Sequence, residues 1–278
     1  MQRRSPAQVI EAFHLAFLIV LCSRPTDWFV LKGGANLRYF FGSPRYSNDI
    51  DFDFTARPAW GVARSVQAVL DSAAMVQLSH TARLEVVECS APKQTPTTLR
   101  WKIAIRGPES SDVLRTKIEF SGRNNTSVGK RSSRLASIDL THDDTVFESV
   151  PDVIVRPYAL QAPALCHYGA TSAINQKIAA LALRSETKAR DIFDLDLLSR
   201  QRRADNHSMS GLDATHAKAA ASRALEISYA SFVSEVAPFL DDELLALYNA
   251  GAWDAMCRSV AEWLNELRPT KAPKGDQS

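Results

Sequence analysis

Three aspartates at alternate positions, Asp49, Asp51 and Asp53, are the residues of this chain best suited to chemistry. They lie in a strand-like stretch, DIDFDF, with Ile50 and Phe52 between them. Side chains two apart on a strand point to the same face, with Cα atoms roughly 6 to 7 Å apart. Asp49 and Asp51 can therefore coordinate one cation together, while the apolar residues between them face the core. Such alternating carboxylates are suited to a hard divalent ion at the edge of a sheet.

A pair of glycines comes before the aspartates. Gly33 and Gly34 follow a short apolar run at residues 29–31, and one short helix separates them from the aspartate strand. Glycines let backbone amides approach a phosphate chain closely, and the following helix offers its positive N-terminus. An ordinary turn would explain two glycines by themselves. Their place ahead of the aspartates predicts that a phosphate cradle and the metal ligands converge.

Glu119 is a candidate third carboxylate. It lies in an expected strand at residues 114–120, where Arg115 and Lys117 share its face while Ile118 and Phe120 point the other way. It could complete a two-ion site that activates an attacking hydroxyl and steadies a leaving pyrophosphate. The alternative is an exposed strand face with mixed charges.

A second group of candidates lies at residues 176–198. Lys177 and Arg184 share a helical face, and Asp191 and Asp194 stand three apart on the next helix. A lysine beside a nucleotide would neutralise triphosphate charge, and an aspartate would orient that lysine or bind a base or ribose. Taken alone, the stretch is better explained as a charged amphipathic helix pair.

A sheet-based half must position the aspartates. Helices are predicted at 6–21, 35–41 and 58–74, and strands at 28–31, 47–54, 83–89, 99–106, 113–120 and 152–156. The three strands between 83 and 120 should be antiparallel.

A helical half must position Lys177 and Asp191. From residue 159 onward the pattern is helical with no sign of a second sheet, and helices are expected at 173–183, 190–198, 211–237, 241–250 and 253–267. We expect a first domain over residues 1–157, a helical domain over 158–268 and a frayed tail at 269–278.

Composition permits several partners and requires none. The 278 residues are 45% hydrophobic, which is enough for a sizeable core, and the formal net charge is +2. Four cysteines, Cys22, Cys89, Cys166 and Cys257, have no paired spacing, so we expect reduced, buried thiols. The most hydrophobic segment, residues 12–22, is too short to span a bilayer and reads as a buried amphipathic helix. The expected compartment is the cytosol, with no membrane partner.

The order and spacing of three stretches resemble the AbiEii/AbiGii-type nucleotidyltransferases, toxins of type IV toxin–antitoxin systems. The stretches are LKGGANLRYF, RYSNDIDFDF and KIAALALRSETKARDIFDL, which together anchor roughly residues 28 to 200. The resemblance implies an α+β fold: a mixed, largely antiparallel nucleotidyltransferase sheet flanked by helices, followed by an all-helical C-terminal domain. The wider DNA polymerase beta-like superfamily often has Gly-Ser at the turn, so Gly34 removes a hydroxyl contact to phosphate here.

The resemblance also implies site residues and cofactors. Asp49 and Asp51 would hold Mg²⁺ or Mn²⁺, an NTP would be the donor substrate, and an acceptor hydroxyl would attack its α-phosphorus in line. The expected catalytic residues are Asp49, Asp51, Lys177, Asp191 and Glu119, and the expected nucleotide-binding residues are Gly33, Gly34, Ser47, Lys32 and Arg38. For Arg38 and the neighbouring Arg45, a contact to phosphate and a role in holding the loop both stay open.

The acceptor is expected to be RNA, with the tRNA 3′ end as the preferred candidate. Basic stretches at residues 130–134 and 200–203 could follow a phosphate backbone, although such loops are often only solvated surface. Two alternatives stay open: a transferase that modifies a protein or a small molecule, and a catalytically silent nucleotide- or RNA-binding module. The family further implies a cognate antitoxin protein as partner.

Overall fold

The computed structural model describes residues 4–55, 57–95, 97–108, 111–122, 144–202 and 208–269. The chain divides into two compact units, Met1–Gly169 and Ala170–Ser278. Unit 1 thus extends beyond the boundary expected near Pro157.

Unit 1 is built on one mixed sheet in the order β3-β5-β6-β2-β1-β8-β7, with β4 also paired to β5. β2 is antiparallel to β1 and parallel to β6, and β1 is parallel to β8. The remaining pairings are antiparallel, including the expected β3–β5 and β5–β6 pairs. The strands are β1 (Phe29–Lys32), β2 (Asp49–Phe54), β3 (Glu85–Cys89), β4 (Lys93–Gln94), β5 (Thr98–Arg106), β6 (Leu114–Gly122), β7 (Thr145–Ser149) and β8 (Ala164–Tyr168).

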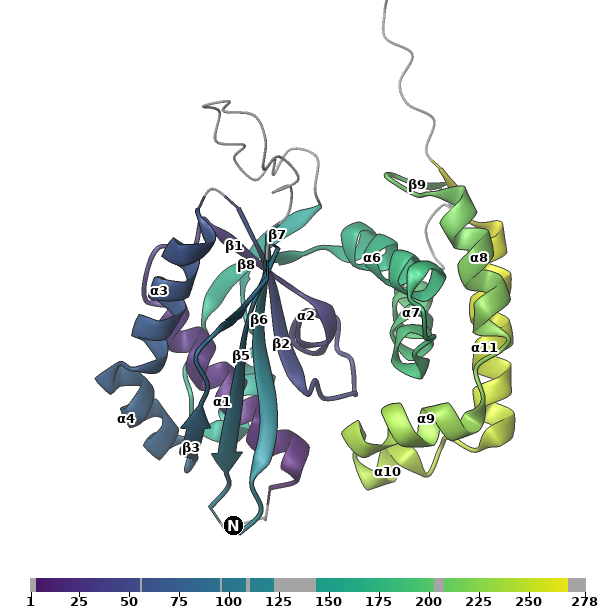
Figure 1. Ribbon diagram of the computed structural model, residues 1–278. Helices are drawn as coiled ribbons and strands as arrows, with labels where there is room; N and C mark the ends of the chain where they lie inside the picture. Colours follow the sequence, from purple (N-terminus) through teal and green to yellow (C-terminus); the bar gives the residue numbers. More distant parts are fainter. Residues whose placement is uncertain are drawn as a thin grey trace, which may run out of the picture. The chain divides into compact units, whose positions relative to one another are not determined.

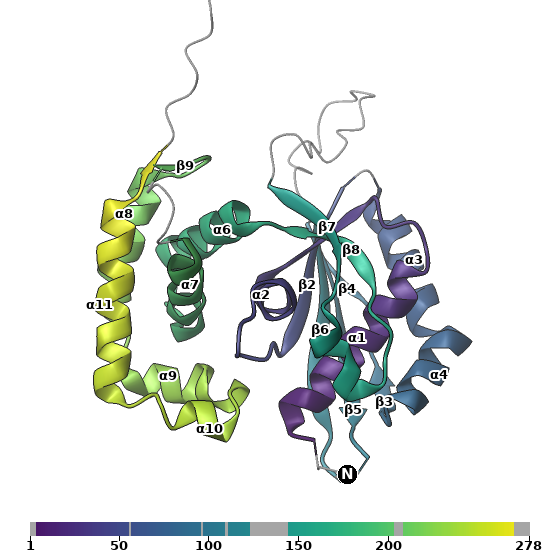
Figure 2. The same cartoon turned by 180° about the vertical axis from the view of Figure 1, so that it is seen from behind.

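Helices lie on both faces of this sheet. α1 (Pro6–Cys22), α3 (Ala59–Leu70) and α4 (Ala73–Thr81) lie on one face, and α2 (Gly33–Phe40) lies on the other, as Figures 1 and 2 show from opposite sides. The core lies between the sheet and the helices α1, α3 and α4. It includes Phe52, Phe120 and Trp101, each 0% exposed. The opposite face of β2 and β6 is therefore left for charged side chains.

α1 is buried on nearly all sides rather than along one stripe. It begins with a capping box, in which Ser5 accepts from the backbone of Gln8 and the Gln8 side chain accepts from the backbone of Ser5. Its buried residues include the polar Glu11 and His14. The prediction of a buried helix is confirmed, but the prediction that it is amphipathic is wrong. No helix in the described part of the chain is long and apolar enough to cross a membrane.

The end of unit 1 differs from the sequence prediction. The strand predicted at 152–156 is wrong, because Pro151 is the N-cap of a short helix, α5 (Asp152–Val155), and Pro157 lies in the 3₁₀ turn η1 (Arg156–Tyr158) that follows. Residues 164–168 lie in the stretch with a helical pattern but in none of the predicted helices, and they form β8, which pairs with β1 and with β7. A short apolar run such as ALCHY cannot be assigned by periodicity alone.

Unit 2 is mainly helical: α6 (Ala170–Leu183), α7 (Ala189–Arg202), α8 (Ala214–Ala224), α9 (Tyr229–Glu235), η2 (Ala237–Phe239), α10 (Asp242–Leu245) and α11 (Ala250–Glu266). A small parallel ladder joins β9 (Ser208–Met209) to β10 (Arg268–Pro269), so the unit is not all-helical. The helix predicted over 211–237 is two helices, because Ser228 caps a new one at α9.

All four cysteines are free, as expected. Cys257 is buried, Cys22 and Cys166 are partly buried, and Cys89 is exposed. The expectation of buried thiols is therefore wrong at Cys89, which lies on the edge strand β3.

Candidate active site

The predicted alternation along β2 is confirmed. Ile50 and Phe52 are 0% exposed, while Asp49 and Asp51 are only partly buried. Residues paired across neighbouring strands share a face of the sheet. Asp51 pairs with Lys32 on β1 and with Glu119 on β6, and Asp49 pairs with Lys117. One face of the sheet thus carries a cluster of charged side chains around the two aspartates.

The glycine pair lies directly on this charged face. A Cβ at Gly33 would stand 2.8 Å from Asp51 Oδ2, and the φ of Gly33 is +73°. A Cβ at Gly34 would stand 2.6 Å from Ser47 Oγ and 3.1 Å from Arg45 Nη2. Only residues without a Cβ allow α2 to begin this close to the aspartate strand. The glycine turn and Asp51 therefore meet, as the sequence predicted.

The N-terminus of α2 has no side-chain cap, because its N-cap residue is Lys32. The first N–H groups of a helix have no partner within the helix, and they attract anions. In this fold they begin at Gly33, beside the carboxylate of Asp51. An anion that also carries a cation, such as a metal-bound phosphate, suits that combination of charges.

Asp49 is held by its neighbours. Lys117 Nζ lies 2.9 Å from Asp49 Oδ2, and Asn48 Nδ2 donates to Asp49 Oδ1 at 3.3 Å. The hydroxyl of Ser47 donates to the backbone carbonyl of Asp49 at 2.8 Å, which fixes the start of β2. Ser47 thus positions the metal-ligand candidate through the backbone.

Glu119 is paired in register with Asp51, but its carboxylate is bound by Arg100. Arg100 Nη2 lies 2.6 Å from Glu119 Oε2. Among the described residues, no group of three or more His, Cys, Asp or Glu side chains is arranged to hold a metal ion. The structure thus places Glu119 beside the aspartates without assembling a three-carboxylate site.

The two aspartates nevertheless fit a magnesium ion. Mg²⁺ is usually bound by one or two carboxylates, with substrate phosphates and waters completing its octahedron. Asp49 and Asp51 supply oxygen donors on one face, and 23% of the Asp49 side chain is accessible. Lys117 pairs with Asp49, so a metal ion would compete with this lysine for the carboxylate.

Lys32 and Arg38 have structural partners. Lys32 Nζ lies 2.6 Å from Asp53 Oδ1, and the hydroxyl of Tyr168 donates to Asp53 Oδ2 at 2.9 Å. Arg38 Nε donates to Glu11 Oε1 at 2.8 Å, and Arg38 Nη1 donates to the carbonyl of Ser43 at 3.0 Å. Of the two roles left open for Arg38, these contacts favour holding the loop.

Glu11 is a buried anchor for that loop. It is 3% exposed, and besides Arg38 it accepts a hydrogen bond from the hydroxyl of Tyr158 at 2.6 Å. Burial, together with the charge of Glu11, raises the pKa of Tyr158 well above its usual value. The phenol therefore stays protonated and donates to Glu11 throughout the physiological range.

The sequence did not indicate the residues that attach α2 to β8. Asn36 Nδ2 donates to the carbonyl of Tyr168 at 2.8 Å, and Asn36 Oδ1 lies 2.9 Å from His167 Nδ1. The rings of Phe40 and His167 stack with centroids 3.7 Å apart. These contacts fix the helix that carries the glycine turn. The sequence did not indicate them because the strand at residues 164–168 was not recognised from periodicity.

Lys177 and Asp191 lie together within unit 2. Lys177 Nζ is 3.1 Å from Asp191 Oδ1 and 2.6 Å from Asp194 Oδ2, and Arg184 also binds Asp191. Both aspartates are 0% exposed. Both aspartates that the sequence placed near Lys177 contact its ammonium group.

The expected basic stretches are only partly described. Residues 130–134 and Arg203 lie outside the described residues. Arg200 pairs with Asp196 at 2.8 Å, and Arg202 donates to the hydroxyl of Thr171 at 3.1 Å. The two described arginines thus have partners within unit 2.

Comparisons with known proteins extend these observations. A family model described as "Nucleotidyl transferase AbiEii toxin, Type IV TA system" matches residues 20–266. The fold is similar to the crystal structure of JHP933 from Helicobacter pylori, with a TM-score of 0.58, 18% identity, and coverage of 95% of this chain and 94% of that one. It is also similar to a crystal structure from H. pylori named as a candidate nucleotidyltransferase, with a TM-score of 0.60, 17% identity, and coverage of 95% and 96%. A comparison with curated proteins gives no match.

Proposed function

Because this chain belongs to the AbiEii family of nucleotidyltransferase toxins of type IV toxin–antitoxin systems, we propose that it transfers a nucleoside monophosphate from an NTP to an RNA hydroxyl. The preferred acceptor is the tRNA 3′ end, and the expected consequence is a block of growth or translation. The observation that carries the proposal is the approach of the glycine turn to Asp51, with 2.8 Å between a Cβ at Gly33 and Asp51 Oδ2.

Asp49 and Asp51 would hold Mg²⁺ or Mn²⁺ in this site. When bound, such an ion neutralises phosphate charge and polarises the phosphorus under attack. The two carboxylates supply its protein oxygens, and Ser47 keeps the Asp49 backbone in place through its hydroxyl. Lys117, which pairs with Asp49 in the structure, would supply a positive charge to the phosphates beside the ion.

The glycine turn would bind the phosphate chain. The backbone N–H groups that open α2 donate to phosphate oxygens, and no side chain stands in their way. The acceptor hydroxyl forms a new bond to the α-phosphorus, the bond from that phosphorus to the β-phosphate oxygen breaks, and pyrophosphate leaves. The hydroxyl proton passes to water. No protein nucleophile is required.

Lys177 is proposed as a further phosphate ligand, on the strength of the family resemblance. Asp191 and Asp194 hold its ammonium group at 3.1 and 2.6 Å. A lysine fixed in this way loses little side-chain freedom when it binds an anion, which favours binding. Glu119 is proposed as a third carboxylate that acts once Arg100 releases it.

The acceptor class is the part of the proposal that most needs experiment. The protein would be incubated with each labelled NTP, Mg²⁺, and either total RNA, tRNA or a protein extract. We expect label in tRNA with wild-type protein and none with Asp49→Asn, whereas Glu88→Gln, which changes an exposed carboxylate on β3, keeps full activity. Label only in protein would favour the protein-modifying alternative. No label with any NTP or acceptor would contradict the proposal.

Expression in a bacterial host tests the toxin role, and a cytosolic site of action is proposed for it. Wild-type protein should arrest growth, and Asp49→Asn should not. A cognate antitoxin protein is the proposed partner and should restore growth when co-expressed. Equal growth of wild type and Asp49→Asn would count against toxicity by nucleotidyl transfer.

A further inference from the structure

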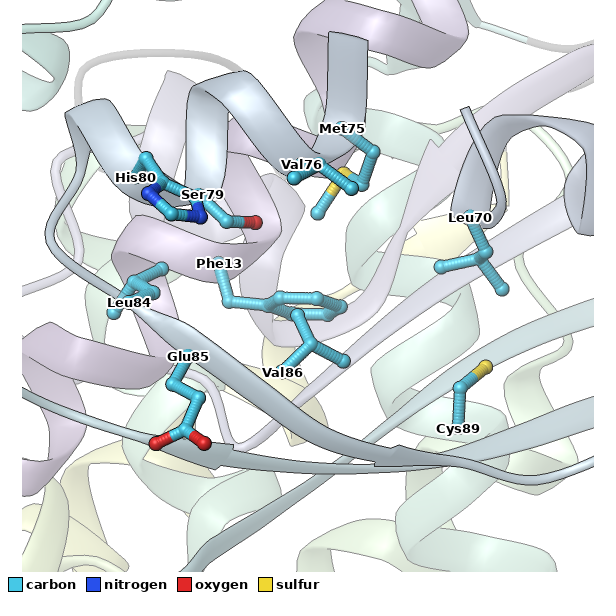
Figure 3. Close-up of a pocket in the computed structure, with 10 residues that line it drawn as sticks. All are labelled: Phe13, Leu70, Met75, Val76, Ser79, His80, Leu84, Glu85, Val86 and Cys89. Atoms are coloured by element: carbon cyan, nitrogen blue, oxygen red, sulfur yellow. The ribbon is translucent and has the colours of Figure 1, made fainter. Parts of the chain in front are cut away.

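An apolar cavity lies within unit 1, on the three-helix face of the sheet rather than on the face of Asp49 and Asp51. Its volume is about 290 Å³. Figure 3 shows it between α4 and β3, with the ring of Phe13 from α1 between the two. Its apolar lining comes from Phe13, Leu70, Met75, Val76, Leu84 and Val86. This volume is at the lower end of the range for small-molecule pockets in proteins.

Ser79 gives the cavity one buried polar group. The residue is 4% exposed, and its Oγ has no hydrogen-bond partner among the described residues. Figure 3 shows this hydroxyl directed into the space between Met75 and Phe13. A serine within a helix usually bonds back to a carbonyl one turn earlier, and a buried hydroxyl without a partner destabilises the fold. A ligand with a polar atom would relieve that cost.

The mouth of the cavity is apolar and accessible. Val76 is 56% exposed and Val86 is 40% exposed, both unusually high for valines that line a cavity. The charged lining residue Glu85 is already paired with Arg106. The thiol of Cys89 also lines the cavity, and an ordinary thiol is neutral at pH 7. His80, the remaining polar lining residue, is exposed, so the buried part of the lining offers no charged partner to a ligand.

We propose that this cavity is a binding site for a neutral, largely apolar small molecule. The ligand has about the size of two fused rings and carries one hydroxyl or carbonyl group that hydrogen-bonds to Ser79 Oγ. The ring of Phe13 provides an aromatic contact, and Met75 and Val86 cover the two sides. The site is independent of nucleotidyl transfer.

The first test uses 2-naphthol as the probe and the full-length protein. Titration should shift the methyl signals of Met75, Val76 and Val86 in ¹³C-labelled protein. Val86→Trp should fill the mouth and abolish binding, whereas Val87→Trp should not, because Val87 is similarly exposed (43%) but does not line the cavity. No binding, shifts elsewhere in the protein, or equal binding by both variants would overturn the proposal.

The second test isolates the role of Ser79. Wild-type protein should bind 2-naphthol more tightly than naphthalene by roughly three- to tenfold, the effect of one net hydrogen bond. Ser79→Ala should lose that preference and bind naphthalene as well as wild type does. It should also fold at least as stably, because it removes an unpaired buried hydroxyl. An unchanged preference in Ser79→Ala would overturn the assignment of the hydroxyl as the polar contact.

Discussion

The absence of a Cβ at Gly33 allows two things: the positive φ of the residue and its close approach to the charged face of the sheet. The residue has a φ of +73° and lies against the carboxylate of Asp51. A side chain there would meet both a strained backbone and a steric clash. The sequence predicted that the glycines and the aspartates converge, because the spacing between them leaves room for one short helix. It did not indicate how close the contact would be, with 2.8 Å between a Cβ at Gly33 and Asp51 Oδ2.

Gly34→Ala tests close packing at the same turn. The new Cβ would stand 2.6 Å from Ser47 Oγ, so we expect destabilisation by about 1 to 3 kcal/mol and a loss of NTP transfer. The matched control is Gly61→Ala in α3, where the nearest atom would be Pro58 Cγ at an ordinary 3.6 Å. That control should stabilise by about 0.5 to 1 kcal/mol. Chemical denaturation of both variants measures the contrast, and equal effects would show that the turn tolerates a side chain.

The ion-pair partners of the candidate residues could not be predicted from the sequence alone. Arg100 binds Glu119, and Lys117 binds Asp49, because the strands pair in one particular register. Register depends on the whole sheet and shifts every side chain when it slips by one residue. The sequence could therefore name Glu119 as a candidate but not the arginine that holds it.

At the scale of elements, α1 shows how tertiary burial can override a sequence pattern. His14 is fully buried, and its Nε2 lies 2.7 Å from the hydroxyl of Thr116 on β6. Burial lowers the pKa of His14 to about 3, from an ordinary value of 6.5. Between these values the unfolded chain binds the proton and the folded protein does not, so stability falls as the pH falls.

His14→Gln should flatten this pH dependence. Between pH 6.5 and pH 4.5, the free energy of unfolding of the wild type should decrease more steeply than that of the variant, by up to about 1.4 kcal/mol per pH unit. Urea denaturation at several pH values measures it. His80→Gln, at an exposed position of α4, is the control and should keep the wild-type slope. A wild-type slope in His14→Gln would show that His14 is not buried in its neutral form.

The strands were predicted where alternation was clear and missed where it was not. β5 alternates buried and accessible residues from Thr98 to Ile103 and β6 from Arg115 to Ser121, and both strands were predicted. β8 has five residues and contacts β1 on one side and β7 on the other, so its identity depends on segments far away in the sequence. Its absence from the prediction is also why the end of unit 1 was expected too early.

At the scale of the whole molecule, the buried charges of unit 2 decide how the role of Lys177 can be tested. Asp191 and Asp194 are 0% exposed, and Lys177 binds both. Removing one partner from a buried ion pair costs about 3 to 5 kcal/mol, because the other charge is left uncompensated. Loss of activity in Lys177→Met alone would therefore not distinguish a phosphate ligand from a structural lysine.

A double variant separates the two roles. Lys177→Met should destabilise unit 2 by roughly 3 kcal/mol, and adding Asp194→Asn should restore part of that loss, because it removes a buried charge that the lysine compensates, whereas Asp191 keeps its ion pair with Arg184. If Lys177 binds phosphate, the double variant should regain stability without regaining NTP transfer. Thermal melts and the transfer assay on the same samples measure both. Activity that returns together with stability would make Lys177 a structural residue.

The central claim is that Gly33 and Asp51 belong to one site that binds a metal-bound NTP. Calorimetric titration of a non-hydrolysable NTP analogue with and without Mg²⁺ tests it most directly, using wild type, Asp51→Asn, Gly33→Ala and the control Gly42→Ala. Gly42 has a similar φ of +64°, but a Cβ there would meet nothing within 4 Å. We predict Mg²⁺-dependent binding in wild type and Gly42→Ala, and its loss in Asp51→Asn and Gly33→Ala. Mg²⁺-dependent binding that survives in both of those variants would contradict the account.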